Sequence, residues 1–567
     1  MEFEKLANLF SKLETISDKT RKVQYIARFL KELKDQYKET LLLLQGTVFY
    51  PWEQKNLGIA EKGVIRAISI AYGIEKQKVE ELFIKYGDLG IVAEKACEMR
   101  KQKPLLLKPL TVKDVYQTLR KIADIEGEGS QDKKIITFAK LLVNAKPKEA
   151  KYIVRLALEE LRIGVGEGII RDAIAIAFSV TPEAVEYAYS ILLDFGEVVR
   201  IAKEQGEQGL WQVKLQVGRP FRVMLAIRAR NVQEAFDIVG RPAMIEAKYD
   251  GFRLQIHKKG DQVWLWTRRL EDVTRQFPDV VNIVRNRVKA NEIIFEAEAV
   301  GYDKKTNKFL PFQKISQRVK RKYDIEKMAK EIPVELHAFD IVYLEGEQLM
   351  KKPFKERRAL LEKVIDEKEH EIQLSIGIIE KDDKKAYQFY QDCLNKGLEG
   401  VMFKNLNAPY QPGRRVGYMV KLKPTLETLD LVIVAAEWGE GKRSGWLTSF
   451  TVAALDKDTG NYLEVGEVGT GIKEKKERAE DITFEELTEL LKPYIYKQEG
   501  KKVYVKPKIV VEVAYEEIQE SPRYKSGFAL RFPRIVRIRF DRSPKEIDTI
   551  DRIKQIYEMQ RGGIHKQ

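Results

Sequence analysis

A lysine set between two acids is the feature of this sequence with the clearest potential for chemistry. In the stretch IEAKYDGFRLQIH, Glu246 and Asp250 lie on either side of Lys248, and Gly251 follows directly. The stretch alternates like a half-buried strand, on which residues two apart share a face. The side chains of Glu246 and Lys248 are therefore expected to project together, with Asp250 near the following turn.

Paired charges recur on other strands predicted downstream. Strands of a soluble sheet usually hide an apolar face, so several strands with paired charges predict a polar cleft between them. Carboxylates suit Mg²⁺ and lysines suit phosphate oxygens, so this cleft fits a polyphosphate with a divalent metal. For each pair taken alone, a solvent-facing salt bridge is the alternative. The residues concerned are Glu296 with Glu298, Lys421 with Lys423, and Glu399 with Lys404 in opposite parity.

Lys248 can act as a nucleophile only without its proton. A free lysine has a pKa of about 10.4, and burial or nearby cations lower that value. The adjacent carboxylates act in the opposite direction, so bound Mg²⁺ or Lys421 and Lys423 must offset them. Attack on the α-phosphorus of a nucleotide would expel pyrophosphate and leave a lysyl-nucleotide. Gly251 is then expected to let the nucleotide lie close to the backbone.

Three regions of different texture carry these residues. Residues 1–215 repeat apolar side chains at helical spacing and predict an all-α domain. Their glycine-rich loop IGVGEG (163–168) follows a helical pattern, so we interpret it as a helix–helix turn and not as a dinucleotide-binding loop. Residues 216–424 mix short strands with helices and predict an α+β domain. Residues 425–567 predict an all-β barrel, expected to be an OB-fold, followed by a last helix that begins at Ser543.

Composition limits the class of protein. The 567 residues carry a formal net charge of +15, which favours nucleic acid as a partner. The 33% of charged residues is also typical of heat-adapted surfaces. Two distant cysteines exclude a four-cysteine zinc module and a disulfide framework, and fit a reducing cytoplasm. With four histidines, proton transfer by histidine is not expected as the central chemistry, and no signal peptide or membrane span is predicted.

The ordered motifs resemble a known family. KYDG (248–251) matches the K-x-D-G element of covalent nucleotidyltransferases, and SGFALRFPRIVRIRFDR (526–542) resembles the last motif of ATP-dependent DNA ligases. GEGSQ (127–131) and LRIGVGEG (161–168) resemble the DNA-binding domain of archaeal and eukaryotic replicative ligases, so the resemblance covers nearly the whole chain. The motifs between follow in the family's order: TRR (267–269), EAEAVGYD (296–303), HAFDIVYL (337–344), EGVMFK (399–404) and VKLKP (420–424).

The resemblance implies roles for individual residues. Lys248 would be the adenylated nucleophile, with ATP as donor and Mg²⁺ or Mn²⁺ as the metal. The remaining contacts implied are Glu246 and Phe339 on the adenine, Arg253 and Arg268 on ribose and phosphates, Glu298 and Glu399 on metal and ribose, and Arg415, Lys421 and Lys423 on the triphosphate. Met419 stands where the family often has tryptophan, so a stacking contact by an aromatic ring is not expected there.

The last motif is expected to contact DNA. Val536, Ile538 and Phe540 alternate with charged residues, which predicts one buried face and one basic face that could line phosphate. The basic and acidic residues implied there are Arg531, Arg534, Arg539, Asp541 and Arg542. The motif usually ends R-x-D-K, and here arginine replaces that final lysine. A planar guanidinium group therefore takes the place of a compact ammonium group.

A segment of the helical domain resembles a tether to the replication sliding clamp. KQKPLLLKPL (101–110) sits where related archaeal ligases carry that tether, and Gln102, Lys103, Leu105 and Leu106 would form it. Leucines replace the usual aromatic pair, and a loop anchored in the core is the alternative.

Together these patterns predict a monomeric ATP-dependent DNA ligase that seals nicked duplex DNA in replication, repair and recombination. We expect it in the cytoplasm, associated with the nucleoid, with its domains encircling the duplex. Two rivals share some of the features: an RNA ligase or capping-type guanylyltransferase, and a non-catalytic scaffold that binds DNA or the clamp. NAD⁺ is not expected as donor, because NAD⁺-using ligases carry a four-cysteine zinc site that this chain lacks.

Overall fold

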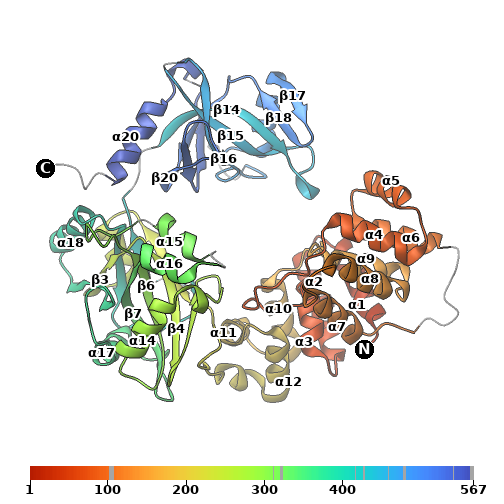
Figure 1. Ribbon diagram of the computed structural model, residues 1–567, viewed down its shortest axis with the longest axis horizontal. Helices are drawn as coiled ribbons and strands as arrows, with labels where there is room; N and C mark the ends of the chain where they lie inside the picture. The colour runs from red at the N-terminus through yellow and green to blue at the C-terminus, as the bar shows by residue number, and fades with distance from the viewer. Residues whose placement is uncertain are drawn as a thin grey trace.

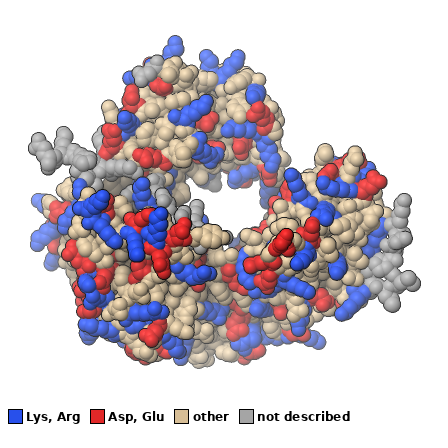
Figure 2. Space-filling view, viewed as in Figure 1, with Lys and Arg blue, Asp and Glu red and all other residues tan. Residues whose placement is uncertain are grey.

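Three regions surround a central opening. The computed structural model describes residues 1–100, 108–310, 312–319, 323–414, 417–424, 428–457, 459–476, 481–540 and 542–561. A helical, a mixed and a β-rich region follow one another along the chain (Figure 1), as the sequence predicts. Figure 2 shows the opening between them, with Lys and Arg side chains on parts of its rim. Arg415, Asp541 and the tether residues Gln102, Lys103, Leu105 and Leu106 lie outside the described residues.

Helices make up the N-terminal region. Apolar residues at helical spacing bury one face of each helix, as Phe3, Phe10 and Leu13 do in the first. The loop at 163–168 joins two helices, so its interpretation as a helix–helix turn is confirmed. The helices are α1 (Phe3–Thr15), α2 (Lys19–Glu32), α3 (Tyr37–Leu44), α4 (Glu61–Tyr72), α5 (Lys76–Tyr86), α6 (Leu89–Met99), α7 (Val112–Ala123), α8 (Ser130–Val143), α9 (Pro147–Ala157), α10 (Glu167–Phe178), α11 (Pro182–Leu192) and α12 (Phe195–Trp211).

Two large sheets form the middle region, each with its own hydrophobic core, and the short strands β1 and β12 pair with each other. The first, called here the β3 sheet, has the order β10-β3-β11-β13-β2; the second, the β6 sheet, has the order β5-β4-β6-β7-β8 with β9 beside β7. The strands are β1 (Met224–Leu225), β2 (Ile227–Ala229), β3 (Ala243–Lys248), β4 (Phe252–Lys259), β5 (Gln262–Thr267), β6 (Glu292–Gly301), β7 (Val334–Leu344), β8 (Glu347–Gln348), β9 (Ile372–Leu374), β10 (Gly377–Glu380), β11 (Gly400–Asn405), β12 (Gly413–Arg414) and β13 (Met419–Leu422).

Helices cover these sheets. Helix α17 packs on β7, while α13 and α18 pack on the β3 sheet. The helices are α13 (Val232–Val239), α14 (Pro278–Arg287), α15 (Phe312–Val319), α16 (Ile325–Glu331), α17 (Phe354–Val364) and α18 (Asp383–Asn395), with a 3-10 turn η1 (Thr274–Gln276).

The β6 sheet has one apolar and one polar face. Leu254, Phe295 and Ala297 point into the hydrophobic core. The alternate positions carry polar side chains, and Arg253 on β4 lies opposite Glu298 on β6 in the strand register. The alternation of residues in the sequence predicted paired charges on this polar face.

The C-terminal region is rich in strands, with one sheet in the order β16-β15-β14-β18-β17 to which β19 and β22 are joined. Its elements are β14 (Leu429–Trp438), η2 (Gly441–Arg443), β15 (Leu447–Leu455), β16 (Tyr462–Val468), α19 (Phe484–Leu491), η3 (Lys492–Tyr494), β17 (Ile495–Glu499), β18 (Lys502–Val505), β19 (Val510–Ala514), β20 (Glu517–Glu520), β21 (Phe528–Arg531), β22 (Arg534–Ile538), η4 (Pro544–Glu546) and α20 (Ile550–Arg561). The capping pair at Ser543 exists, but it caps the short turn η4, and the last helix begins at Ile550.

The expected burial pattern of the last motif is wrong. Val536 is 45% exposed and Phe540 is 73% exposed, whereas Ile535 is only 1% exposed. The register between β19 and β22 shifts at this point, so that the inward positions are Ile535 and Ile538, three residues apart. An irregularity of this kind displaces the alternation on one strand, which the period-two pattern cannot anticipate.

The N-terminal and C-terminal regions approach each other across the opening. Burial lowers the pKa of Lys22 on α2, and Lys442 in η2 lies close enough to lower that pKa further. The Lys22 ammonium donates to the carbonyl of Ile163 at 2.6 Å, so it is anchored in its own region. In the described part of the chain, no helix is both long and apolar enough to cross a membrane.

Candidate active site

Lys248 ends strand β3, and its ammonium group donates to the carboxylate of Glu399. The other oxygen of that carboxylate accepts from Lys423, so one anion bridges two cations. The backbone fixes this arrangement, because the amide of Glu399 donates to the carbonyl of Lys248 at 2.8 Å. Gly400 follows with φ +145°, and a side chain there would collide with the carbonyl of Leu422. Glycine therefore lets the start of β11 bring Glu399 to the lysine.

The lysines of the site have lowered pKa values. Burial lowers the pKa of the Lys248 amine, although the carboxylates of Glu298 and Asp250 act in the opposite direction. Burial lowers the pKa of Lys423 to about 8, and the charge of Lys248 adds to that shift. Burial also lowers the pKa of Lys421. The neutral form of the Lys248 amine is therefore more populated in this site than for a free lysine in water. The nucleophilic attack inferred for Lys248 requires this neutral form.

Glu298 is a carboxylate of the site with a strongly raised pKa. Burial raises its pKa to about 7, while Lys248 and Arg253 act to lower it. Among the described residues, no group of three or more His, Cys, Asp or Glu side chains could hold a metal by itself. Mg²⁺ commonly takes one or two carboxylates together with waters and substrate phosphates. Glu298 and Glu399 fit a metal that arrives with a polyphosphate.

Arg253 is held tightly on the polar face of the β6 sheet. Its guanidinium group donates to both carboxylate oxygens of Glu296, at 2.9 and 2.6 Å, and to the carbonyl of Met224 at 2.7 Å. The Tyr410 hydroxyl donates to the same Glu296 carboxylate at 2.9 Å. A bidentate pair of this kind fixes the plane of the arginine. Arg253 also lies over the ring of Phe339, 5.3 Å from its centroid.

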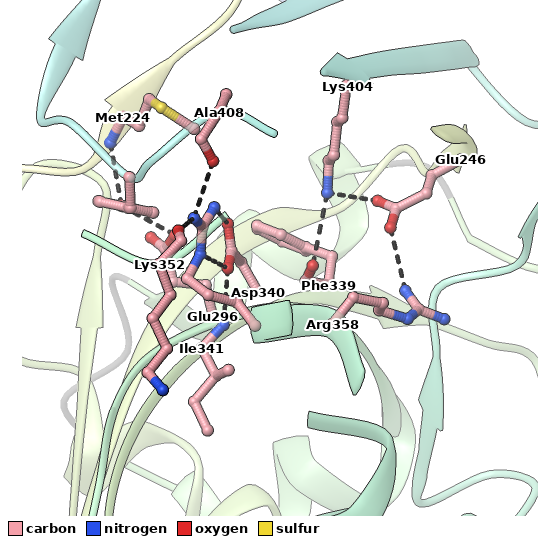
Figure 3. Close-up of polar contacts among 12 residues, drawn as sticks. Met224, Glu246, Glu296, Phe339, Asp340, Ile341, Lys352, Arg358, Lys404 and Ala408 are labelled. Atoms are coloured by element: carbon pink, nitrogen blue, oxygen red, sulfur yellow. Dashed lines mark hydrogen bonds and ion pairs between the residues drawn. The ribbon is translucent and has the colours of Figure 1, made fainter. Parts of the chain in front are cut away.

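Glu246 and Phe339 lie at the junction of the two sheets (Figure 3). The carboxylate of Glu246 is buried and accepts from Arg358 at 3.0 Å and from Lys404. Lys404 also donates to the carbonyl of Phe339 at 3.5 Å and lies 4.8 Å from the centroid of its ring. Lys404 on β11 thereby connects Glu246 on β3 to Phe339 on β7.

Arg268 and Arg531 act on the lysines of the site through their charge. Arg268 is exposed in the turn after β5. Burial is the largest cause of the lowered pKa of Lys421, and the charges of Lys248 and Arg268 lower that pKa further. Arg531 ion-pairs with Glu517 at 3.0 Å and also contributes to lowering the pKa of Lys248, so β21 faces the site.

The end of the last motif is turned inward to its own sheet. Arg539 and Arg542 both pair with Asp430 on β14, at 3.0 and 3.2 Å. Arg534 is exposed at the start of β22. Met419, which replaces the family's tryptophan, is buried in a core cluster.

Gly251 has a structural reason of its own, and the expected approach of the nucleotide stays a prediction. A Cβ atom there would lie closer than 3.0 Å to the backbone oxygen of Ala299, and 3.1 Å from Cγ of Glu298. The close approach of β4 and β6 therefore requires glycine, whatever binds beside it.

Sequence reasoning missed the residues that hold the site from outside the motifs. Arg357 donates to both oxygens of Asp340, at 2.8 and 3.0 Å, and Arg358 reaches Glu246. Both arginines are buried, and they lie three and four residues after Phe354 on the inward stripe of α17. Two charges within an apolar helical stripe were the signal that could have revealed them.

A partly buried lysine of lowered pKa, set among carboxylates and lysines where two mixed sheets meet, is typical of the class of covalent nucleotidyltransferases. Family comparisons agree. Residues 223–423 match the ATP dependent DNA ligase domain, residues 2–175 the DNA ligase N terminus, and residues 443–542 the ATP dependent DNA ligase C terminal region.

Whole-chain relatives carry the same assignment. DNA ligase of Thermococcus onnurineus is 46% identical over 99% of this chain and 98% of its own, and DNA ligase of Archaeoglobus fulgidus is 43% identical over 99% of each. The solved structure titled Pmar-Lig_Pre shares the fold, with a TM-score of 0.56 and 16% identity over 94% of this chain and 99% of its own. The chain belongs to the ATP-dependent DNA ligase family, and the RNA ligase and scaffold alternatives are not favoured.

Proposed function

We propose that Lys248 is the nucleophile that takes AMP from ATP. Its amine attacks the α-phosphorus, a phosphorus–nitrogen bond forms, and the bond to pyrophosphate breaks. Glu399 accepts the hydrogen bond of the ammonium and is the group placed to hold the proton that the amine gives up. The observation that carries this proposal is the partly buried lysine at the end of β3, which has a lowered pKa and a carboxylate partner in Glu399. AMP then passes to the 5′-phosphate at a nick, and the neighbouring 3′-hydroxyl displaces it.

The surrounding residues take the following proposed roles. Lys421 and Lys423 meet the triphosphate, and positive charge at that position stabilises the negative charge that develops on the leaving group. Glu298 and Glu399 would hold Mg²⁺ or Mn²⁺, which neutralises charge on the phosphoryl oxygens when bound. The base and sugar contacts are Glu246 and Phe339 for adenine, and Arg253 and Arg268 for ribose and phosphates, with Arg415 as a further triphosphate contact.

The rest of the chain is proposed to hold the DNA. Domains at 1–215, 216–424 and 425–567, the last an OB-fold, would enclose nicked duplex DNA as a monomer. Arg531, Arg534, Arg539, Asp541 and Arg542 would serve nucleotide or DNA. The two free cysteines are buried, which fits a reducing cytoplasm where the nucleoid supplies the substrate. The sliding-clamp tether of residues 101–110 stays a prediction.

Labelled ATP tests the nucleophile directly. Wild-type protein incubated with α-labelled ATP should carry acid-labile, hydroxylamine-sensitive label, and nicked duplex DNA should discharge it. Lys248→Ala should carry none. Lys259→Ala is the matched control, because this lysine lies on β4, the next strand along the chain, but is exposed. Label on Lys248→Ala equal to wild type would refute the proposal.

A further inference from the structure

Arg358 contacts the site from α17, outside every motif that marks the family in this sequence. The residue is 9% exposed, and its guanidinium group spans three partners. Nη1 donates to Oε1 of Glu246 at 3.0 Å, Nη2 donates to the carbonyl of Ser375 at 3.0 Å, and Nε donates to Glu362 at 2.9 Å. Three hydrogen bonds from one planar guanidinium group fix the orientation of this arginine.

The Glu246 carboxylate is consequently held at both oxygens. Arg358 holds Oε1 and Lys404 holds Oε2, as Figure 3 shows. Lys404 is anchored in turn by the carbonyl of Phe339 and lies between the rings of Phe339 and Phe354, 4.8 Å from each centroid. An ionised carboxylate has about four acceptor positions, and these two hydrogen bonds use two of them. The directions of the acceptor positions are fixed by the two cations.

A fixed carboxylate distinguishes purine bases by their six-position. Adenine carries an amino group there, which donates, whereas guanine carries a carbonyl oxygen, which accepts. An acceptor-only carboxylate attracts the first and repels the second. A carboxylate free to turn could instead accept from the ring N–H of guanine while Lys404 served its oxygen. Discrimination therefore depends on preventing that turn, in addition to the presence of the carboxylate.

We propose that Arg358 is a positioning residue that sets the selectivity of the site for adenine, by fixing the orientation of Glu246. This inference rests on the proposed function, in which Glu246 meets the base. Arg357, the next residue along the chain, provides a contrast. It holds Asp340 and the carbonyls of Lys352 and Ala408, and it makes no contact with Glu246.

The test compares lysyl-nucleotide formation from ATP, from GTP and from purine riboside triphosphate, which lacks the six-amino group. The variants are Arg358→Met, Arg358→Lys and, as control, Glu362→Gln, which removes only the surface partner of the arginine. Wild type should prefer ATP over both analogues. In Arg358→Met the KM for ATP should rise about tenfold, the size of one lost charge-assisted hydrogen bond, with a smaller change in kcat. The preference for ATP over both analogues should fall by a similar factor.

The conservative variant separates positioning from folding. Arg358→Lys keeps the charge without the fork and should recover part of the preference, while Glu362→Gln should behave as wild type. If Arg358→Met does not fold, the preference measured in Arg358→Lys decides the question. A wild-type preference in every folded Arg358 variant would overturn this inference alone. Absence of lysyl-AMP on the wild type would instead overturn the proposed function.

Discussion

Replacing Arg253 by methionine should destabilise the middle region in a manner that depends on pH. The substitution removes both hydrogen bonds from the guanidinium group to Glu296, whose side chain is fully buried. Of the contacts described for this carboxylate, the one from the Tyr410 hydroxyl would remain. A buried carboxylate without its cation is costly, and taking up a proton relieves it.

The magnitude follows from the cost of that proton. Protonation costs about 1.4 kcal/mol for each pH unit above about 4.3, the ordinary value for a glutamate. The orphaned carboxylate should therefore cost about 4 kcal/mol at pH 7.5, within the ~3–5 kcal/mol typical of a broken buried pair. At pH 5.5 the same reasoning gives about 1.6 kcal/mol. The free-energy cost of Arg253→Met should thus fall by more than half as the pH is lowered.

Denaturant unfolding of wild type and variant at the two pH values measures this difference. The double variant Arg253→Met with Glu296→Gln should lose most of the pH dependence, because no carboxylate is left to orphan. Arg287→Met is the control, since its partners Glu371 and Asp366 are partly exposed and its loss should cost about 1 kcal/mol or less at either pH. An equal cost of Arg253→Met at both pH values would refute the reasoning and assign the effect to packing.

Three further predictions concern the site. Gly251→Ala should lower the melting temperature and slow lysyl-AMP formation, because its Cβ would press on the backbone of Ala299 and separate β4 from β6; unchanged melting would contradict this. Lys423→Met should move the pH midpoint of lysyl-AMP formation upward, because removing a neighbouring cation raises the pKa of the Lys248 amine, as single-turnover rates against pH would reveal. Glu298→Gln should be more stable relative to wild type at pH 8 than at pH 5, measured by thermal unfolding. Burial raises the pKa of Glu298 to about 7, so the stability that its protonated form contributes is lost as the pH rises through that value.

Much of the site followed from strand alternation and local order. Period two placed Glu246 with Lys248, and Glu296 with Glu298, on common faces, and the register of β3, β4 and β6 agrees. The helical N-terminal region was predicted equally well, because its apolar residues recur at regular helical spacing over long segments. These are features that a few neighbouring residues determine by themselves.

The contacts that tune the site depend on packing between distant segments. Arg358 reaches Glu246 across 112 positions of the chain. Its place in an apolar helical stripe indicates that it is buried but does not identify its partner. The irregular register of β22 reversed the expected burial of Val536, because a bulge depends on the partner strand. Glu399 is brought to Lys248 by the positive φ angle at Gly400. In the sequence, nothing distinguishes this glycine from the others.

The opening between the three regions has a topological consequence. The polypeptide itself crosses two of the three junctions, from α12 to β1 and from β13 to β14, and only the junction near Lys22 and Lys442 has no covalent link. DNA that offers no free end cannot be threaded, so any passage of such DNA into the opening must go through that unlinked seam. Two like charges face one another there, which weakens the seam when no polyanion lies between them and strengthens it when one does.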